Sequence, residues 1–225
     1  MGIPVLYQDE HLLVCEKPVG IRSENDGLPQ MLKTQCGGEA YCVHRLDQAV
    51  GGLMVYARTP ADAAKLSKAI AERQVRKEYL AVVTGRPEEP KGELRDLLYH
   101  DVHRNKSYVV QRPRRGVKEA VLQYEVLQSR ETEAGRITLL LISLMTGRAH
   151  QIRVQFASRG MPLLGDRRYG SKICADGAPT LWSYRLGFAH PKTEKAMSFL
   201  LAPPDRYPWD LFTEYLNDKS ELPQS

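Results

Sequence analysis

The chain has 225 residues, of which 42% are hydrophobic and 26% charged, and 32 Lys and Arg against 27 Asp and Glu give a net charge of +5 at pH 7. This length and composition fit a globular protein with one large domain or two small ones, and argue against a disordered or fibrous chain. No apolar run approaches the roughly 18 residues of a membrane span, so we expect a cytoplasmic protein without a signal peptide. The positive charge favours an anionic partner.

Two absences limit the chemistry. The four cysteines (Cys15, Cys36, Cys42 and Cys174) include no CxxC pair and show no regular spacing with His, which predicts reduced thiols and no zinc site. The Gly-rich phosphate loops G-x-x-x-x-G-K and G-x-G-x-x-G are also missing. We therefore expect no metal and no cofactor.

Hydrophobic periodicity and turn residues give the expected secondary structure. In chain order, we expect strands over 3–8 and 11–16, a helix over 28–36, a strand over 53–57, a helix over 60–74, a strand over 77–83, three strands over 106–111, 118–129 and 136–144, a helix over 148–160, and two strands over 181–189 and 195–201. Thr59 and Pro60 are expected to be the N-cap and first residue of the second helix.

The order of these elements indicates the fold class. Strands and helices do not alternate regularly, which argues against a doubly wound sheet. We predict an α+β fold with one catalytic domain over residues 1–217, built on a mixed, mostly antiparallel sheet with packed helices. Residues 218–225 are predicted to be a polar C-terminal tail.

Asp47 is the main candidate for chemistry. It lies between Arg45 and the pair Gly51-Gly52, just before an apolar run, so we expect a loop carboxylate placed by a strand. An Asp beside Gly-Gly is, however, more often a turn former whose side chain bonds to nearby main-chain N–H groups. The residues alone leave both interpretations open.

The positive charge is concentrated in segments 103–108 and 111–118. These hold six cationic residues and no acidic one: Arg104, Lys106, Arg112, Arg114, Arg115 and Lys118. Such a run can be a solvated hairpin tip. It can equally bind a phosphate backbone, an alternative that Tyr108 supports because an aromatic ring among cations suits nucleic acid.

Several motifs together resemble one family. His44-Arg45-Leu46-Asp47, with a Gly five residues after the Asp and a Leu-x-Val-x-Ala run behind it, resembles the catalytic signature of the RluA-type pseudouridine synthases. Further similar stretches follow in the family's order: 9–20 with its Lys-Pro-x-Gly turn, 77–85, 146–153 with 160–170, and 186–191. The chain departs from the pattern at Val50-Gly51, where the family usually has Thr-Ser, and at Gln155, where it has His.

The resemblance implies an RNA pseudouridine synthase, an isomerase with a basic cleft that acts on tRNA or rRNA as a monomer, without metal or cofactor. It implies that Asp47 is the nucleophile, that Arg153 pairs with it, and that Tyr79 stacks on the target base. It also implies a substrate-binding set: His44, Arg45, Lys77, Arg148, His150, Gln151 and Ile152. Because no S4-type RNA-binding domain is expected, target choice would come from the catalytic domain.

Two other functions compete with this one. An RNA-binding or RNA-assembly protein could keep the fold without catalysis, but it would not need Asp47, Tyr79 and Arg153 together. A hydrolase could use Asp47 as nucleophile, but it lacks the second well-placed carboxylate that glycoside hydrolysis commonly uses. The synthase is the function that the sequence favours.

Overall fold

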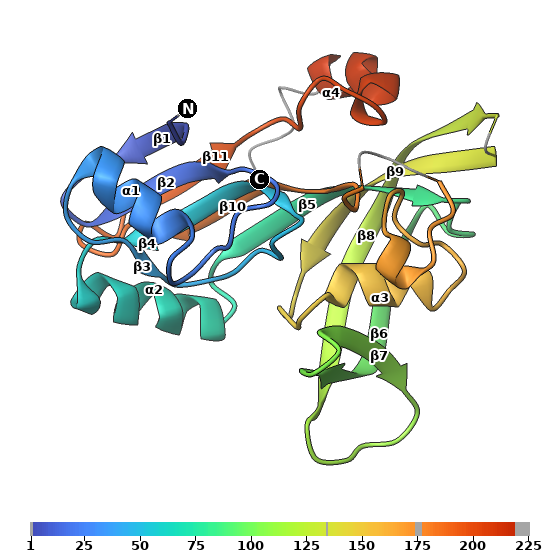
Figure 1. Ribbon diagram of the computed structural model, residues 1–225, viewed down its shortest axis with the longest axis horizontal. Coiled ribbons are helices and arrows are strands. Elements are labelled where there is room, and N and C mark those ends of the chain that lie inside the picture. Colours follow the sequence, from blue (N-terminus) through green and yellow to red (C-terminus); the bar gives the residue numbers. More distant parts are fainter. Residues whose placement is uncertain (1, 134, 174–176, 219–225) are drawn as a thin grey trace. The chain divides into compact units, whose positions relative to one another are not determined.

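The structure is a computed structural model that describes residues 2–133, 135–173 and 177–218 (Figure 1). It contains two compact units. Unit 1 comprises the chain up to Tyr79, Ser143–Met145 and Trp182–Leu201, and unit 2 comprises Leu80–Ile142, Thr146–Leu181 and the chain from Ala202.

Unit 1 is built on strands hydrogen-bonded in the order β1-β2-β4-β10. Their bounds are β1 Val5–Gln8, β2 Leu12–Lys17, β4 Gly51–Ala57 and β10 Leu181–Ala189, with the short β3 (Tyr41–Cys42) on β4 and β11 (Ala196–Leu200) on β10. β10 runs parallel to β4, whereas β1 with β2 and β2 with β4 are antiparallel. The sheet is therefore mixed and mostly antiparallel.

Two helices complete the core of unit 1. α1 (Leu28–Cys36) buries Leu28 and Leu32. α2 (Pro60–Ala71) begins at the predicted N-cap, where the Thr59 side chain accepts a hydrogen bond from the Asp62 N–H. Its residue Leu66 packs into a cluster from β2, β4 and β10: Leu12, Val14, Leu53, Val55, Leu186 and Phe188.

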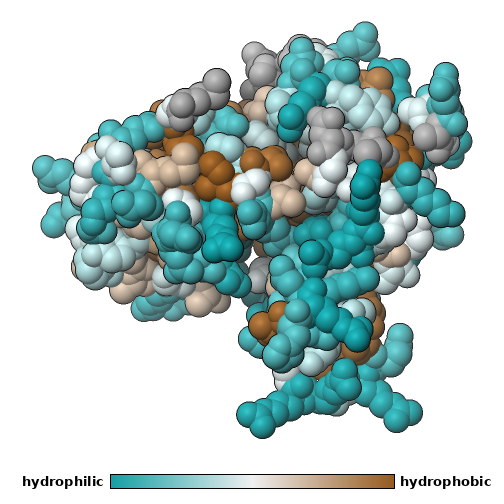
Figure 2. Space-filling model, viewed as in Figure 1, coloured by the Kyte–Doolittle hydropathy of each residue, from teal (hydrophilic) through white to brown (hydrophobic). Residues whose placement is uncertain are grey.

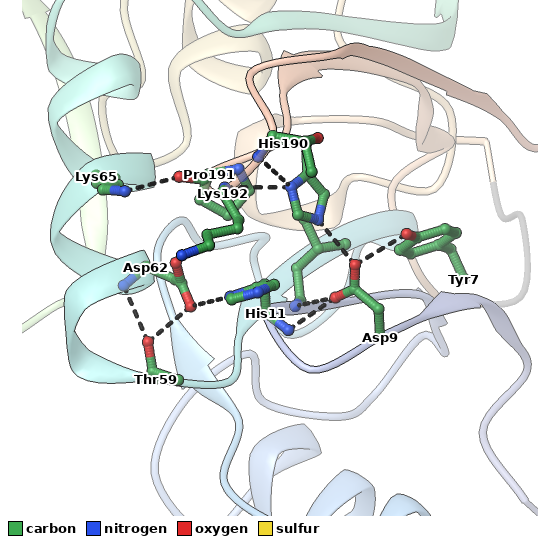
Figure 3. A network of polar contacts seen from close by, with 11 residues as sticks. Tyr7, Asp9, His11, Thr59, Asp62, Lys65, His190, Pro191 and Lys192 are labelled. Carbon is green, nitrogen blue, oxygen red and sulfur yellow. Dashed lines mark hydrogen bonds and ion pairs between the residues drawn. The ribbon is translucent and has the colours of Figure 1, made fainter.

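A polar network joins three turns of unit 1 (Figure 3). His190 lies 2.8 Å from Asp9 (Nε2 to Oδ2), and His11 lies 3.0 Å from Asp62 (Nδ1 to Oδ2). Burial opposes ionisation of Asp9, but main-chain N–H donors lower its pKa to about 2. The network lies where β2 pairs with Ala57 of β4, at the opposite end of this strand pair from the Asp47 loop. It gives the 186–191 motif a structural role.

In unit 2 the strand order is β9-β8-β6-β7. The strands are β6 Lys91–Asp101, β7 Lys106–Val110, β8 Val117–Thr132 and β9 Gly135–Leu144, while β5 (Arg76–Thr84) begins in unit 1 and ends in unit 2. Helix α3 (Gln151–Ala157) packs on this sheet through Val154, which contacts Leu98 of β6 and Ala120 of β8. Two 3₁₀ helices, η1 (Arg167–Tyr169) and η2 (Trp209–Phe212), and α4 (Thr213–Asp218) follow.

The predicted α+β class is confirmed, and α1 and β10 have their predicted bounds. Helix α3 is shorter than the predicted 148–160, because His150 adopts a left-handed conformation (φ 53°) immediately before it. β6 and α4 were not predicted. Of the predicted tail, Asp218 is the last residue of α4, and 219–225 lie outside the described residues. Within the described ranges, no helix has the length and apolar character that a bilayer crossing requires.

Candidate active site

The Asp47 loop of unit 1 is held in a defined conformation. The Val50 N–H donates to the Asp47 carbonyl at 2.9 Å, which forms a turn. On the other side, the Ser23 hydroxyl donates to the Leu46 carbonyl (2.7 Å) and accepts from the Leu46 N–H (3.0 Å). One hydroxyl thus fixes both main-chain groups of the residue before Asp47.

Lys17 fixes the other flank of this loop from inside the protein. Its side chain is fully buried, and Nζ donates to the carbonyls of Pro18 (2.9 Å), Ile21 (2.7 Å) and Gln48 (3.2 Å). Burial lowers the pKa of Lys17 to about 8, although the negative charge of Asp47 opposes this shift. Lys17 and Ser23 therefore both order the main chain of the Asp47 loop.

The departure at Gly51 has a steric cause. A Cβ at this position would lie 2.4 Å from the Trp182 ring and 3.2 Å from a Val19 methyl. At Gly52 the backbone has φ 113°, and a Cβ would lie 2.4 Å from the Ser183 carbonyl oxygen. The close β4–β10 pairing accounts for both glycines, so a Ser at Gly51 would not fit beside Trp182.

Tyr79 is electrostatically linked to Asp47 within unit 1. Its side chain lies in β5 with 5% of the residue exposed. Burial, followed by the charge of Asp47, raises the pKa of Tyr79 well above its ordinary value. The phenol is therefore neutral at physiological pH, and it lies close enough to the carboxylate for the two to interact.

His44 and Lys77 form a second pair beside the loop. The Val55 N–H donates to His44 Nε2 at 3.2 Å, so this nitrogen carries no proton. Burial and the positive charge of Lys77 lower the pKa of His44 to about 3. Burial also lowers the pKa of Lys77. His44 is thus a neutral side chain that braces β4.

Arg45 projects into solvent. Nη1 lies 3.1 Å from Glu24 Oε1, and both side chains are largely exposed, at 64% and 43%. An exposed ion pair of this kind contributes little to stability. Arg45 can therefore leave Glu24 for another anion at small cost.

Arg153 lies in α3 of unit 2 and forms a buried, bidentate ion pair with Asp166. Nε donates to Oδ2 at 2.6 Å and Nη2 donates to Oδ1 at 2.9 Å. The guanidinium also lies over the Tyr169 ring, 5.1 Å from its centroid. The Asp166 contacts use Nε and Nη2, so this buried pair holds the guanidinium in one orientation.

The residues before Arg153 are tied to the protein itself. The Gln151 side chain accepts from the Thr146 hydroxyl (2.8 Å) and the Arg148 N–H (3.0 Å), and donates to the Val121 carbonyl (3.1 Å). Ile152 is buried, at 4% exposed. These two side chains support the turn that leads into α3, and a role in substrate binding stays a prediction for them.

His150 and Arg148 complete this turn. His150 Nδ1 lies 2.9 Å from the Tyr169 hydroxyl. The exposed Arg148 donates from Nε to the Glu119 carbonyl at 2.8 Å. The contact of His150 and Arg148 with substrate stays a prediction.

Gln155, where the family pattern has His, is fully buried in α3. Its amide donates to Asp96 Oδ2 at 2.7 Å and to the Leu94 carbonyl at 3.2 Å. Arg159 binds the same carboxylate at 2.9 Å. Gln155 therefore anchors α3 to β6, a structural role that an uncharged hydrogen-bonding side chain can fill.

The six predicted RNA-backbone residues all lie on one segment of unit 2. Arg104 is in the β6–β7 turn, Lys106 begins β7, and the others lie in or just after the β7–β8 loop: Arg112, Arg114, Arg115 and Lys118. All are exposed except Lys106, which is half-buried. The structure therefore brings all six onto the segment that runs from the β6–β7 turn to the start of β8.

Sequence reasoning left four supporting residues without a role: Lys17, Ser23, Asp166 and Tyr169. Three of these lie in stretches that resemble the family, so the motifs marked their positions but not their contacts. Ser23 had no signal, because a lone Ser gives no local pattern. Among the described residues, no three His, Cys, Asp or Glu side chains converge on a possible metal position.

Comparison with known proteins agrees with this architecture. The family model described as RNA pseudouridylate synthase matches residues 11–158. Dual-specificity RNA pseudouridine synthase RluA of Escherichia coli strain K12 is 35% identical over 208 residues, which cover 87% of this chain and 90% of that protein. An uncharacterized RNA pseudouridine synthase of Aquifex aeolicus is 33% identical over 229 residues, covering 91% and 71%.

Solved structures show the same fold. Human RNA Pseudouridylate Synthase Domain Containing 4 superimposes with a TM-score of 0.73 at 25% identity, covering 95% of this chain and 92% of that one. Human RNA Pseudouridylate Synthase Domain Containing 1 gives 0.75 at 23% identity, covering 92% and 85%. The class is thus that of the RNA-modifying isomerases with a pseudouridylate synthase domain. The chain belongs to the RNA pseudouridylate synthase family, as an RNA pseudouridine synthase of the RluA type.

Proposed function

We propose that this enzyme isomerises specific uridines in structured RNA, either tRNA or rRNA, through the carboxylate of Asp47. The observation that carries the proposal is the Asp47 loop itself. Its main chain is fixed on both flanks by Ser23 and Lys17, and its carboxylate interacts with the buried Tyr79. A turn with only a structural role would need neither the buried ammonium of Lys17 nor the buried phenol of Tyr79.

The reaction needs only acid–base or nucleophilic help. The N1–C1′ bond of uridine breaks, the uracil rotates, C5 bonds to C1′, and C5 loses its proton as N1 gains one. An ionised Asp47 can attack C1′ or take a proton from C2′ to form a glycal. Both routes need a charged carboxylate in a site that RNA closes to water.

Arg153 is the residue we propose to keep Asp47 ionised. A guanidinium that stays charged in a closed site favours the carboxylate form of a neighbouring Asp. Asp166 and Tyr169 support the proposal, because they fix the orientation of the buried Arg153 guanidinium.

Tyr79 is proposed to stack on the target uracil and to assist removal of the C5 proton. Its raised pKa keeps the phenol protonated in the free enzyme, so proton removal from C5 would need the hydroxyl to pass its own proton on. The neutral ring is well suited to stacking on a base.

The target base must leave its helix before it can react, at a cost of a few kcal/mol that a loop or distorted stem reduces. Arg45 is proposed to take part in this displacement, since its ion pair with Glu24 is exposed and weakly held. The cations of segments 103–118 are proposed to bind phosphates of the RNA. Side-chain contacts to exposed loops and bulges would then select the uridine.

The experiment is release of tritium to water from cellular RNA labelled at uridine C5, with RNA from cells that lack this gene. The protein is compared with its Asp47→Asn variant, and Glu24→Gln serves as a matched control because it removes a nearby carboxylate outside the proposed chemistry. RNA affinity and thermal unfolding are measured for all three. We expect release from the wild type and Glu24→Gln and none from Asp47→Asn.

Release by a folded, RNA-binding Asp47→Asn variant would reject Asp47 as the reacting carboxylate. Fractionating the modified RNA into tRNA and rRNA then identifies the target class. Modification of neither class would reject that part of the proposal.

A further inference from the structure

Strands β6 and β7 and the start of β8 form an arm in unit 2, defined here as residues 97–118. β6 pairs with β7 on one side and with β8 on the other. Figure 1 shows these strands and their loops below α3, and Figure 2 shows mostly hydrophilic residues over this part of the molecule. The six cations of the predicted RNA-backbone set all belong to the arm.

The two faces of the arm differ. On one face, Leu98 and Ala120 pack against Val154 of α3. Because side chains alternate along a strand, Tyr99 and Tyr108 project from the opposite face. They are direct partners in the β6–β7 register, and both are half-exposed. Two aromatic rings therefore lie side by side on a face that α3 does not cover.

Each of these rings has a cation beside it. Arg114 Cζ lies 4.7 Å from the centroid of the Tyr99 ring, and Lys106 Nζ lies 5.7 Å from that of Tyr108. The acidic side chains nearby are already engaged: Asp101 accepts from the Arg104 N–H, and Glu119 pairs with Arg95. Residues 97–118 hold six Lys and Arg and one acidic residue, Asp101, so the arm as a whole carries a net positive charge.

The turn at the end of the arm is held by unit 2. Arg168 Nη1 donates to the carbonyls of Arg104 (3.0 Å) and Asn105 (2.7 Å), and the Ser107 N–H donates to the Tyr169 hydroxyl at 2.8 Å. A surface fixed in this way loses little conformational entropy when a ligand binds.

We propose that the face carrying Tyr99 and Tyr108 is a stacking platform for unpaired bases of the RNA, with Arg114 and Lys106 beside the flanking phosphates. This deepens the proposed function and rests on it, since it takes RNA as the ligand. Aromatic rings among cations suit single-stranded nucleic acid, because every unpaired base offers a flat face and every nucleotide a negative charge. A duplex would offer only its phosphates to the same surface, since its bases are already stacked.

The test measures binding in the Asp47→Asn background, so that turnover does not change the ligand. The probes are a short single-stranded oligouridylate and an RNA duplex of equal length. Tyr99→Leu and Tyr108→Leu are each expected to weaken oligouridylate binding about tenfold, as the loss of one stacked base does. Tyr99→Phe and Tyr108→Phe keep the ring and are expected to bind normally.

Salt dependence separates stacking from charge. Neither Leu variant should change the slope of log K against log salt, whereas Arg114→Gln should reduce it by about 0.7 for a single strand. Unchanged oligouridylate affinity in a folded Tyr99→Leu/Tyr108→Leu double variant would overturn the inference. An equal loss for the duplex would also overturn it, because the rings would then not be reading unpaired bases.

This outcome is separable from failure of the proposed function. If C5 tritium release depends on Asp47 while the Leu variants bind both probes normally, only the platform is wrong. If the Leu variants lose oligouridylate binding but release does not depend on Asp47, the catalytic proposal fails and the platform stands.

Discussion

The ammonium of Lys17 donates a hydrogen bond to the main-chain carbonyl of Gln48, the residue that follows Asp47, at 3.2 Å. Two further carbonyls, of Pro18 and Ile21, share the same ammonium. A charge placed at the end of β2 thus joins the Lys-Pro-x-Gly turn to the loop that carries Asp47.

We expect Lys17→Met to destabilise the protein by about 1 to 3 kcal/mol, because up to three partly buried carbonyls lose their donor, while desolvation of the ammonium is avoided. Turnover should fall as well, since the Asp47 loop loses one anchor. Urea unfolding and C5 tritium release check the two effects. A variant with unchanged stability would show that these hydrogen bonds are not needed to hold the loop.

Lys17 also predicts a pH dependence of stability. Its folded pKa of about 8 lies below the ordinary lysine value of about 10.4. Between these two pH values the unfolded chain holds a proton that the folded chain has released, so the free energy of unfolding rises with pH, by up to about 1.4 kcal/mol per unit. Lys17→Met should lack this rise. Equal slopes for the two proteins between pH 8 and pH 10 would contradict it.

The buried pair of Arg153 and Asp166 should be strongly coupled. Asp166→Ala is expected to cost about 3 to 5 kcal/mol, because it removes a bidentate partner from a buried guanidinium. The double variant with Arg153→Met should cost less than the sum of the single changes. Glu93→Ala, which breaks an exposed pair with Arg95, is the control and should change little. Additive single costs in urea unfolding would show that the pair is not coupled.

Local patterns predicted the elements whose signals are local. The start of α2 depends on the neighbouring residues Thr59 and Pro60, and its predicted N-cap is confirmed. The predicted bounds of α1 are confirmed as well. β6 was missed because its residues do not alternate cleanly, and pairing with β7 and β8 makes it a strand. Tertiary pairing can override a weak local pattern.

The site shows the same division. The motifs indicated Asp47 and Tyr79 as site residues, and in unit 1 the charge of Asp47 contributes to the raised pKa of the buried Tyr79. No local pattern, however, indicates that Ser23 would hold Leu46 or that Asp166 would hold Arg153, because each of these partners comes from a distant part of the chain. Supporting contacts of this kind are fixed by the fold.

His44 should remain neutral well below the usual histidine range. Burial and Lys77 lower its pKa to about 3, whereas an unfolded histidine titrates near 6.5. As pH falls below about 6.5, the unfolded chain gains a proton that folded His44 does not, so this residue lowers stability progressively toward acid. NMR of the imidazole nitrogens should show that Nε2 of His44 stays unprotonated as the pH is lowered through about 6.5. A titration of His44 near this pH in the folded protein would contradict the assignment.

Gly51 offers a test of why this chain departs from the family pattern. Gly51→Ser should be strongly destabilising, because the new Cβ would meet the Trp182 ring at 2.4 Å. Trimming the ring should relieve the clash, so Gly51→Ser/Trp182→Leu should recover stability relative to the sum of the two single changes. Thermal unfolding of the three variants measures this coupling. If Trp182→Leu gives no relief, the clash does not explain the glycine, and the close β4–β10 approach at Gly52 would be the remaining steric constraint on this segment.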